Sequence, residues 1–161
     1  ERQIKSMVSK DYLETGLGAI CWCLEHGLTQ QAFTMLRELV ISLVCLMKDP
    51  AFNLQDNRQR DSISELLNIA VKKYLEKKNV EEPDFDEERK IIQRLGEYPE
   101  LLTLYKRVRD DRNDLNHAGY NKDNKNASAF EYLSQNISQY THVLRKFWEH
   151  ELQKEGTISS Q

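Results

Sequence analysis

Apolar residues recur at helical steps along most of this chain, and no stretch shows the sustained alternation typical of a β-strand. The clearest example is 29–48, TQQAFTMLRELVISLVCLMK, where apolar residues recur at steps of three and four and also fill the other faces. A helix that is apolar nearly all round lies in the centre of a core or in a subunit interface. The pattern therefore predicts an all-α fold, a helical bundle of about five or six helices, with this helix at its centre.

Capping and breaking residues give bounds for the predicted helices. Gly27 should end a first helix over 10–26 in a left-handed conformation, and Thr29 should cap the central helix, which runs to about Asp49. A Ser-x-x-Glu spacing opens a helix as a capping box, and a proline suits a helix's first turn. The remaining predicted helices are 62–78, opened by Ser62 and Glu65; 86–95, ended by Gly96; 99–117, opened by Pro99; and 128–154, opened by Ser128 and Glu131.

The 161 residues suit one domain. We expect a helical domain over 10–154, a linker from a missing N-terminal part over 1–9, and a tail over 155–161. The formal net charge of −3 argues against a generally basic nucleic-acid coat, so any nucleic-acid site has to be a local patch. We find no membrane span and no signal peptide, which predicts a cytoplasmic protein without a membrane partner.

The three cysteines fit neither a zinc site nor a disulfide framework in number or spacing, which predicts buried thiols in a reducing compartment. His142 and His150 have no carboxylate partner at ligand spacing, so no metal site is expected. His26, just before Gly27, is expected to cap or pack a helix end. The acidic run over 81–88 is expected to be a solvated loop and cap.

An anomaly lies at 107–120, RVRDDRNDLNHAGY. On a helical wheel that starts at Leu101, Arg112 falls about 20° from the centre of the apolar stripe, where a leucine would be expected. One flank of the helix, at about 60° to 160°, carries five further polar residues: Lys106, Arg109, Asn113, Asn116 and His117. Three aspartates, at positions 110, 111 and 114, fall on the opposite side. The helix thus collects cationic and neutral polar groups on one flank, just before it ends.

Two interpretations of Arg112 remain open. A buried arginine is usually paired with an acid, because desolvating a lone charge costs several kcal/mol. Alternatively, the guanidinium is part of an anion site, since it can hold a phosphate through two parallel hydrogen bonds. His117 brings a histidine to this segment, the residue type whose unperturbed pKa permits proton transfer near neutral pH.

Arg112 and His117 are five residues apart, hence roughly 140° apart around a straight helix. Both can serve one pocket only if the helix unwinds near Gly119 or if a second copy of the chain supplies the missing half. A symmetric dimer would place two Arg/His sets around one groove.

The segment from Arg112 to His117, RNDLNH, resembles the R-x(4–6)-H motif of HEPN domains, in which the residue after the arginine is often polar, here Asn113. Residues 17–40, LGAICWCLEHGLTQQAFTMLRELV, resemble the opening helix pair of the HEPN half of CRISPR-associated CARF–HEPN ribonucleases, in the group with a DxTHG motif. The resemblance covers most of 10–150. No motif matches over 50–98.

This resemblance implies an endoribonuclease of type III CRISPR antiviral defence in prokaryotes. It would cleave single-stranded RNA, not DNA, by metal-independent attack of the ribose 2′-OH, as a homodimer with a shared active site. Arg112 would hold the scissile phosphate, His117 would move a proton, and Asn113 would position either. Arg109, Asn116 and Lys106 are candidates for backbone phosphate contacts. No cofactor is implied, and the cyclic oligoadenylate effector would bind a CARF domain ahead of Glu1.

Three alternatives remain at this stage. The chain could be a catalytically inactive HEPN module for dimerisation or partner binding. It could be a HEPN toxin held in check by an antitoxin. It could also be an unrelated helical bundle in which Arg112 pairs with an internal aspartate.

Overall fold

The computed structural model describes residues 2–117 and 125–153, with side chains for residues 10–113 and 131–151. Every regular element in these ranges is helical, and the described residues contain no strand, so the predicted all-α bundle is confirmed. The elements are α1 (Arg2–Glu25), α2 (Thr29–Lys48), α3 (Asn57–Ala70), α4 (Asp86–Leu95), α5 (Pro99–His117) and α6 (Lys125–Trp148). Two π-helical turns, η1 (Val71–Leu75) and η2 (Glu149–Gln153), extend α3 and α6.

Helix α2 is the centre of the bundle, as its sequence predicts. Twelve of its residues are buried, and it packs against α1, α3, α5 and α6. By length and hydropathy alone α2 would also suffice to cross a membrane, which the sequence analysis did not recognise. In the described part of the chain its apolar side chains are used to form the core.

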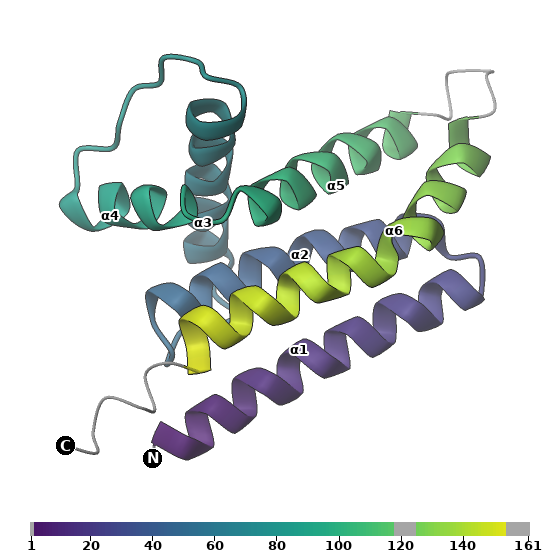
Figure 1. Ribbon diagram of the computed structural model, residues 1–161, viewed down its shortest axis with the longest axis horizontal. Helices are drawn as coiled ribbons and strands as arrows, with labels where there is room; N and C mark the ends of the chain where they lie inside the picture. Colours follow the sequence, from purple (N-terminus) through teal and green to yellow (C-terminus); the bar gives the residue numbers. More distant parts are fainter. Residues whose placement is uncertain (1, 118–124, 154–161) are drawn as a thin grey trace.

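Four helices, α1, α2, α5 and α6, pack together as the central layer of the bundle (Figure 1). α1 and α2 run antiparallel, α5 packs on α2, and α6 runs alongside α1 and α5, while α3 crosses this layer and leads through a loop to α4. The start of α2, the end of α5 and the start of α6 lie at the same end of the molecule. The polar residues singled out in the sequence lie at this end.

Several predicted helix starts are wrong, and for α3 the reason is a different cap. α3 begins five residues before Ser62, because Asp56 caps it: its carboxylate accepts from Gln59 N at 3.1 Å, and the Gln59 side chain bonds back to it at 2.8 Å. α2 has Leu28 at its cap position, without a side-chain cap, and Thr29 is already helical. α6 begins at Lys125, so Ser128 lies inside the helix. α1 begins at Arg2, within the segment expected to be a linker.

Two glycines end helices for different reasons. Gly27 has a φ of 71°, the left-handed conformation predicted for it. Gly96 has an ordinary helical φ of −62°, but a Cβ at this position would lie 2.6 Å from Cζ of Tyr74. α4 therefore ends where a residue without a side chain is needed for close packing against the η1 turn.

A polar network joins three helices inside this apolar bundle. The Glu38 carboxylate of α2 accepts hydrogen bonds from Arg37 at 2.6 Å and from Arg60 of α3 at 2.7 Å. Arg37 also donates to Ser64 of α3 at 2.9 Å, and Ser64 contacts the buried hydroxyl of Tyr105 on α5 at 2.9 Å. Because each of these groups has a partner, the network fixes how α2, α3 and α5 pack without leaving an unpaired charge.

The expected burial of the cysteines is only partly correct. Cys23 and Cys45 are buried, whereas Cys21 is exposed on α1. Burial raises the pKa of the Cys45 thiol to about 11. Trp22 is 53% exposed and stacks on the ring of His26. His26 contacts the Trp22 carbonyl through Nδ1 at 2.8 Å, which is the helix-capping role expected for it.

Candidate functional site

The side chain of Arg112 extends from α5 to the first half of α2. Its side chain is half-buried, and its Nε donates to Oγ1 of Thr34 on α2 at 3.2 Å. The helical-wheel expectation that this arginine points toward the core side of α5 agrees with that contact. The partner that the described residues supply is thus a neutral hydroxyl, not a carboxylate.

The other two predicted catalytic residues are described to different extents. Asn113 is exposed next to Arg112. The backbone of α5 remains helical through His117, while the side chains of Asn116 and His117 lie outside the described residues. The Cα atoms of positions 112 and 117 are therefore separated by roughly 140° around an unbroken helix. Gly119, where unwinding was considered, also lies outside the described residues.

The predicted separation of charges around α5 is wrong for one aspartate. Asp110 lies between two of the predicted RNA contacts, accepting from Lys106 at 2.9 Å and from Arg109 at 2.8 Å. Arg109 also donates to Oδ1 of Asn68 on α3 at 2.8 Å. Partial burial would raise the pKa of the Asp110 carboxyl, but the hydrogen bonds from Lys106 and Arg109 outweigh it, and the pKa is lowered. On the wheel Lys106 and Asp110 are only about 40° apart, and oppositely charged residues four positions apart on a helix commonly form ion pairs.

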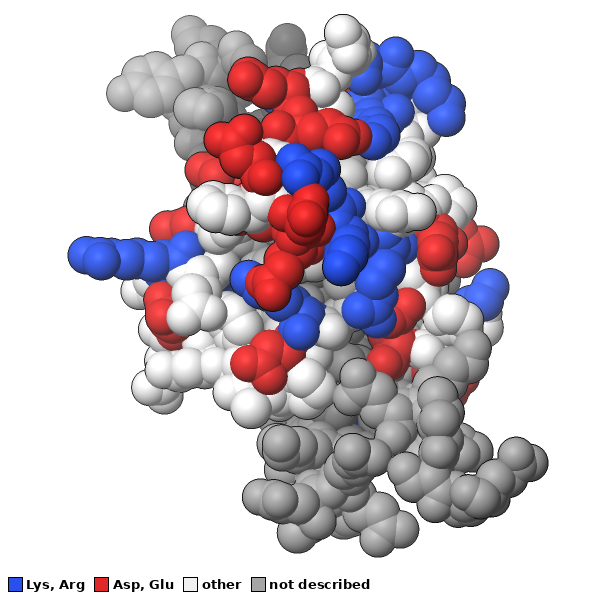
Figure 2. All heavy atoms as spheres, turned by 90° about the vertical axis from the view of Figure 1, so that its left-hand side faces the viewer, with Lys and Arg blue, Asp and Glu red and all other residues white. Residues whose placement is uncertain are grey.

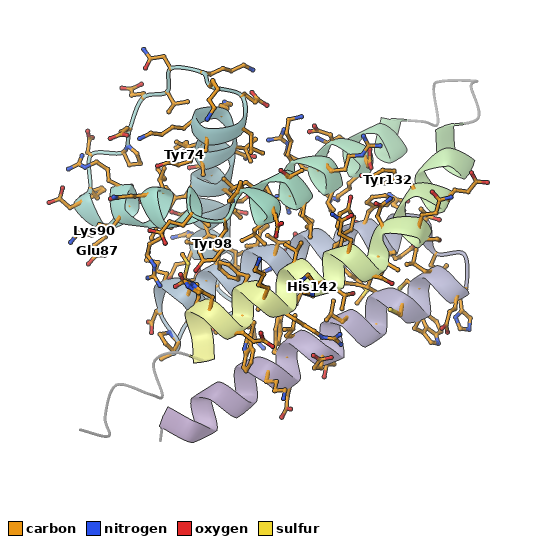
Figure 3. All side chains as sticks on the ribbon, viewed as in Figure 1. Tyr74, Glu87, Lys90, Tyr98, Tyr132 and His142 are labelled. Atoms are coloured by element: carbon orange, nitrogen blue, oxygen red, sulfur yellow. The ribbon has the colours of Figure 1, made fainter. Side chains whose placement is uncertain are left out.

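Arg107 ties α5 to α6 one turn before Arg112. Its guanidinium donates to Asp111 at 2.8 Å and lies 4.2 Å from the ring centroid of Tyr132, which is labelled at the α5–α6 contact in Figure 3. Tyr132 also accepts a hydrogen bond at 3.0 Å from Tyr140, further along α6. This clamp fixes the part of α5 that carries Arg112 against the neighbouring helix.

Charges of opposite sign alternate on the surface seen in Figure 2, and neither sign covers it. The acidic run over 81–88 is a loop followed by the first turn of α4, with most of its side chains exposed, as predicted. Within it Glu82 pairs with Lys73 of the η1 turn. This face therefore offers no broad basic field for a nucleic-acid backbone.

A second polar cluster, which the sequence analysis missed, lies at the opposite end of α5. Tyr98 sits beside the end of α6 (Figure 3) and hydrogen-bonds to His150 and Glu151 of η2. Arg94 of α4 pairs with the same Glu151, whose side chain is only 7% exposed. A cavity of about 490 Å³ adjoins this cluster. Lys146 and His150 line the cavity, as do Glu97 and Glu100, so its charge selects neither an anion nor a cation.

The protonation of this cluster follows from its donors and acceptors. Burial would raise the pKa of Glu151, but hydrogen bonds from Tyr98 and Arg94 outweigh it and hold the pKa below its ordinary value. An ionised carboxylate only accepts, so Tyr98 donates to Glu151. The hydroxyl oxygen of Tyr98 then accepts from His150 Nδ1–H. The cluster thus latches the last turn of the α6 segment to the α4–α5 junction.

Thr34 and the Glu38 network are not predicted by the helical periodicity of the sequence. The available signal was the presence of polar residues inside the otherwise apolar 29–48 segment. An Arg-Glu pair or a threonine in a buried helix needs a polar partner, and that partner has to come from another element. Which element supplies it depends on helix packing, which the periodicity of one helix does not give.

Comparison with known proteins adds no relative. No protein-family model, curated protein or solved structure matches this chain. Among the described residues, no three His, Cys, Asp or Glu side chains are grouped as a metal site would require.

Proposed function

We propose that this domain is a metal-independent endoribonuclease that cleaves single-stranded RNA, with Arg112, Asn113 and His117 at a site shared between two copies of the chain. The observation that carries the proposal is the partner of Arg112. Its partner among the described residues is a neutral hydroxyl, so no described carboxylate offsets the positive charge that would attract a phosphate. The segment RNDLNH, similar to a HEPN motif, supplies the imidazole on the same helix.

The chemistry needs no metal ion. The 2′-oxygen of a ribose attacks the adjacent phosphorus and loses its proton, while the bond from phosphorus to the 5′-oxygen breaks and that oxygen gains a proton. The products are a 2′,3′-cyclic phosphate and a 5′-OH. Arg112 would stabilise the negative charge that grows on the phosphate oxygens, His117 would move a proton, and Asn113 would position the phosphate or the imidazole.

The unbroken α5 helix supports a shared site. Because positions 112 and 117 lie roughly 140° apart around it, one copy of the helix cannot direct both residues into one shallow pocket. Two copies related by a two-fold axis would bring the arginine of one to the histidine of the other. Asn116 would lie on the same flank of α5 as Asn113 and His117, and would contact the RNA backbone.

A second candidate is a catalytically inactive HEPN-like module that dimerises or binds a partner. One observation favours it: Lys106 and Arg109, both expected to contact RNA, are paired with Asp110 instead. Because the two cations share one carboxylate, only one net positive charge remains of the two expected to face RNA.

The test is cleavage of a single-stranded RNA by the purified domain under single-turnover conditions, with and without EDTA. Removing a transition-state donor typically costs about 10²–10³-fold in rate, so Arg112→Ala and His117→Ala should each lose at least about 100-fold. Lys90→Ala is the control, because Lys90 is exposed on α4, far from the end of α5. The new 5′ ends should accept phosphate from a polynucleotide kinase without prior dephosphorylation.

EDTA should leave the wild-type rate unchanged. An EDTA-sensitive activity, or full activity in both variants, would contradict this mechanism. Absence of cleavage by the wild type together with stable dimerisation would favour the inactive module.

A further inference from the structure

Arg112 differs from the neighbouring cations of α5 in having no carboxylate partner among the described residues. Lys106 and Arg109 share Asp110, and Arg107 pairs with Asp111, so each of these three cations has a carboxylate partner on α5 itself, although Arg109 also donates to Asn68 of α3. Arg112 is held from a different helix, by the hydroxyl of Thr34, 78 positions earlier in the chain. Within the described residues Arg112 makes no ion pair.

Thr34 occupies a rigid position. It lies on α2, the central helix, between Phe33 and Leu36, both fully buried. Thr34 itself is half-buried, at the edge of the core where α5 packs on α2. On a helix the χ1 angle of a threonine is largely restricted to two rotamers, so its oxygen has few positions to choose from.

A hydroxyl suits this position better than a carboxylate would. A carboxylate would hold the guanidinium equally well, but it would neutralise the positive charge and compete with a phosphate for the same N–H donors. The hydroxyl engages Nε, one of the five N–H bonds of the guanidinium. The other four are on Nη1 and Nη2, the pair that can hold a phosphate through parallel hydrogen bonds.

We propose that Thr34 is a positioning residue for Arg112. Its Oγ1 fixes the Nε edge of the guanidinium, so that the Nη1 and Nη2 edge is aimed before RNA arrives. This inference rests on the proposed ribonuclease function for its consequence in catalysis, while the positioning itself is a property of the free protein. Sub-ångström placement of such a group matters, because a displacement of about 1 Å can cost about 10²-fold in rate.

The test compares Thr34→Val with Thr34→Ser. Valine keeps the volume and replaces the hydroxyl by a methyl group, whereas serine keeps the hydroxyl. Thr34→Val should lower kcat for RNA cleavage by about 10- to 100-fold with KM nearly unchanged, because the guanidinium acts mainly on charge that develops in the transition state. Thr34→Ser should stay within about 3-fold of the wild type. In an Arg112→Ala background Thr34→Val should have no further effect, because the two residues act as one unit.

A second measurement does not depend on activity. The Nε–H signal of Arg112 in an NMR spectrum can be assigned by its loss in Arg112→Ala. In Thr34→Val this signal should shift and exchange faster with solvent, whereas in Thr34→Ser it should remain near its wild-type position. Melting temperatures of both variants should match the wild type, which separates positioning from a loss of folding.

An unchanged Arg112 Nε–H signal in Thr34→Val would overturn the inference, as would an equal loss of activity in Thr34→Val and Thr34→Ser. If the wild type cleaves no RNA, the proposed function fails, and the NMR comparison still decides whether Thr34 holds Arg112.

Discussion

The basic side chains of α5 are distinguished by the partners that hold them. Lys106, Arg107 and Arg109 lie within 3 Å of a carboxylate on their own helix, which offsets part of their charge. Among the described residues, Arg112 is held by a hydroxyl instead. A helical wheel could place Arg112 on the side of α5 that faces the core. It could not identify Thr34 as the partner, because a contact between residues 34 and 112 exists only once α2 and α5 have packed.

Gly96 provides a test of packing at one residue. An alanine Cβ there would lie within 3 Å of several atoms of the Tyr74 ring, although the backbone itself is unstrained. Gly96→Ala should destabilise the fold by about 1–3 kcal/mol through overpacking. Gly18→Ala is the matched control, because a Cβ at Gly18 in α1 meets nothing within 4 Å.

In the control, the alanine should be neutral or stabilise the helix by about 0.5–1 kcal/mol. Urea unfolding of both variants measures the difference. Equal free energies of unfolding for the two variants would contradict the packing of Tyr74 against Gly96.

At the level of helices, the periodicity of apolar residues predicts which segments are helical more reliably than it predicts where they begin. The predicted bounds of 99–117 coincide with α5, since Pro99 opens that helix. α3 begins at Asn57, because Asp56 and Gln59 form the cap and Ser62 and Glu65 do not. Both pairs have the three-residue spacing of a capping box, and spacing alone does not show which pair the chain uses.

The latch at the end of α6 gives a pH-dependent prediction. Glu151→Gln removes the charge that Arg94 and Tyr98 stabilise, and should cost about 1–3 kcal/mol of stability at pH 7. The pKa of Glu151 in the folded protein is lowered from its ordinary value of 4.5. A depressed pKa adds stability above the unfolded-state value, and that stability is lost as the pH falls through the folded-state value.

The difference between wild type and Glu151→Gln should therefore be complete at pH 7 and shrink as the pH falls below the ordinary value of 4.5 and through the lowered folded-state value. Urea unfolding across this range measures it. Glu149→Gln, an exposed glutamate in the same π-helical turn, is the control and should change stability by less than about 0.5 kcal/mol. Equal effects of the two substitutions at pH 7 would show that Glu151 is not part of a latch.

At the level of the whole molecule, one end of the bundle combines the start of α2 with the end of α5 (Figure 1). The Arg107–Tyr132 clamp holds α5 against α6, and the Glu38 network holds the first half of α5 against α2 and α3. The all-α fold and the position of Arg112 could be predicted from the sequence. The i, i+4 spacing of Lys106 and Asp110 also allows their pairing to be predicted. The contact of Arg109 with Asn68 of α3 could not be predicted, because a wheel gives directions and not which partner on another helix a long side chain reaches.

The most direct test of a shared Arg112/His117 site is complementation between two inactive variants. Arg112→Ala and His117→Ala are each assayed alone for cleavage of single-stranded RNA, and then mixed in equal amounts and allowed to exchange subunits. Each alone should retain about 1% of the wild-type rate or less. The mixture should recover about a quarter of that rate, because half of the dimers are mixed and each holds one intact arginine–histidine pair out of two. A mixture as inactive as its components, or full activity in either variant alone, would contradict a shared site built from these two residues.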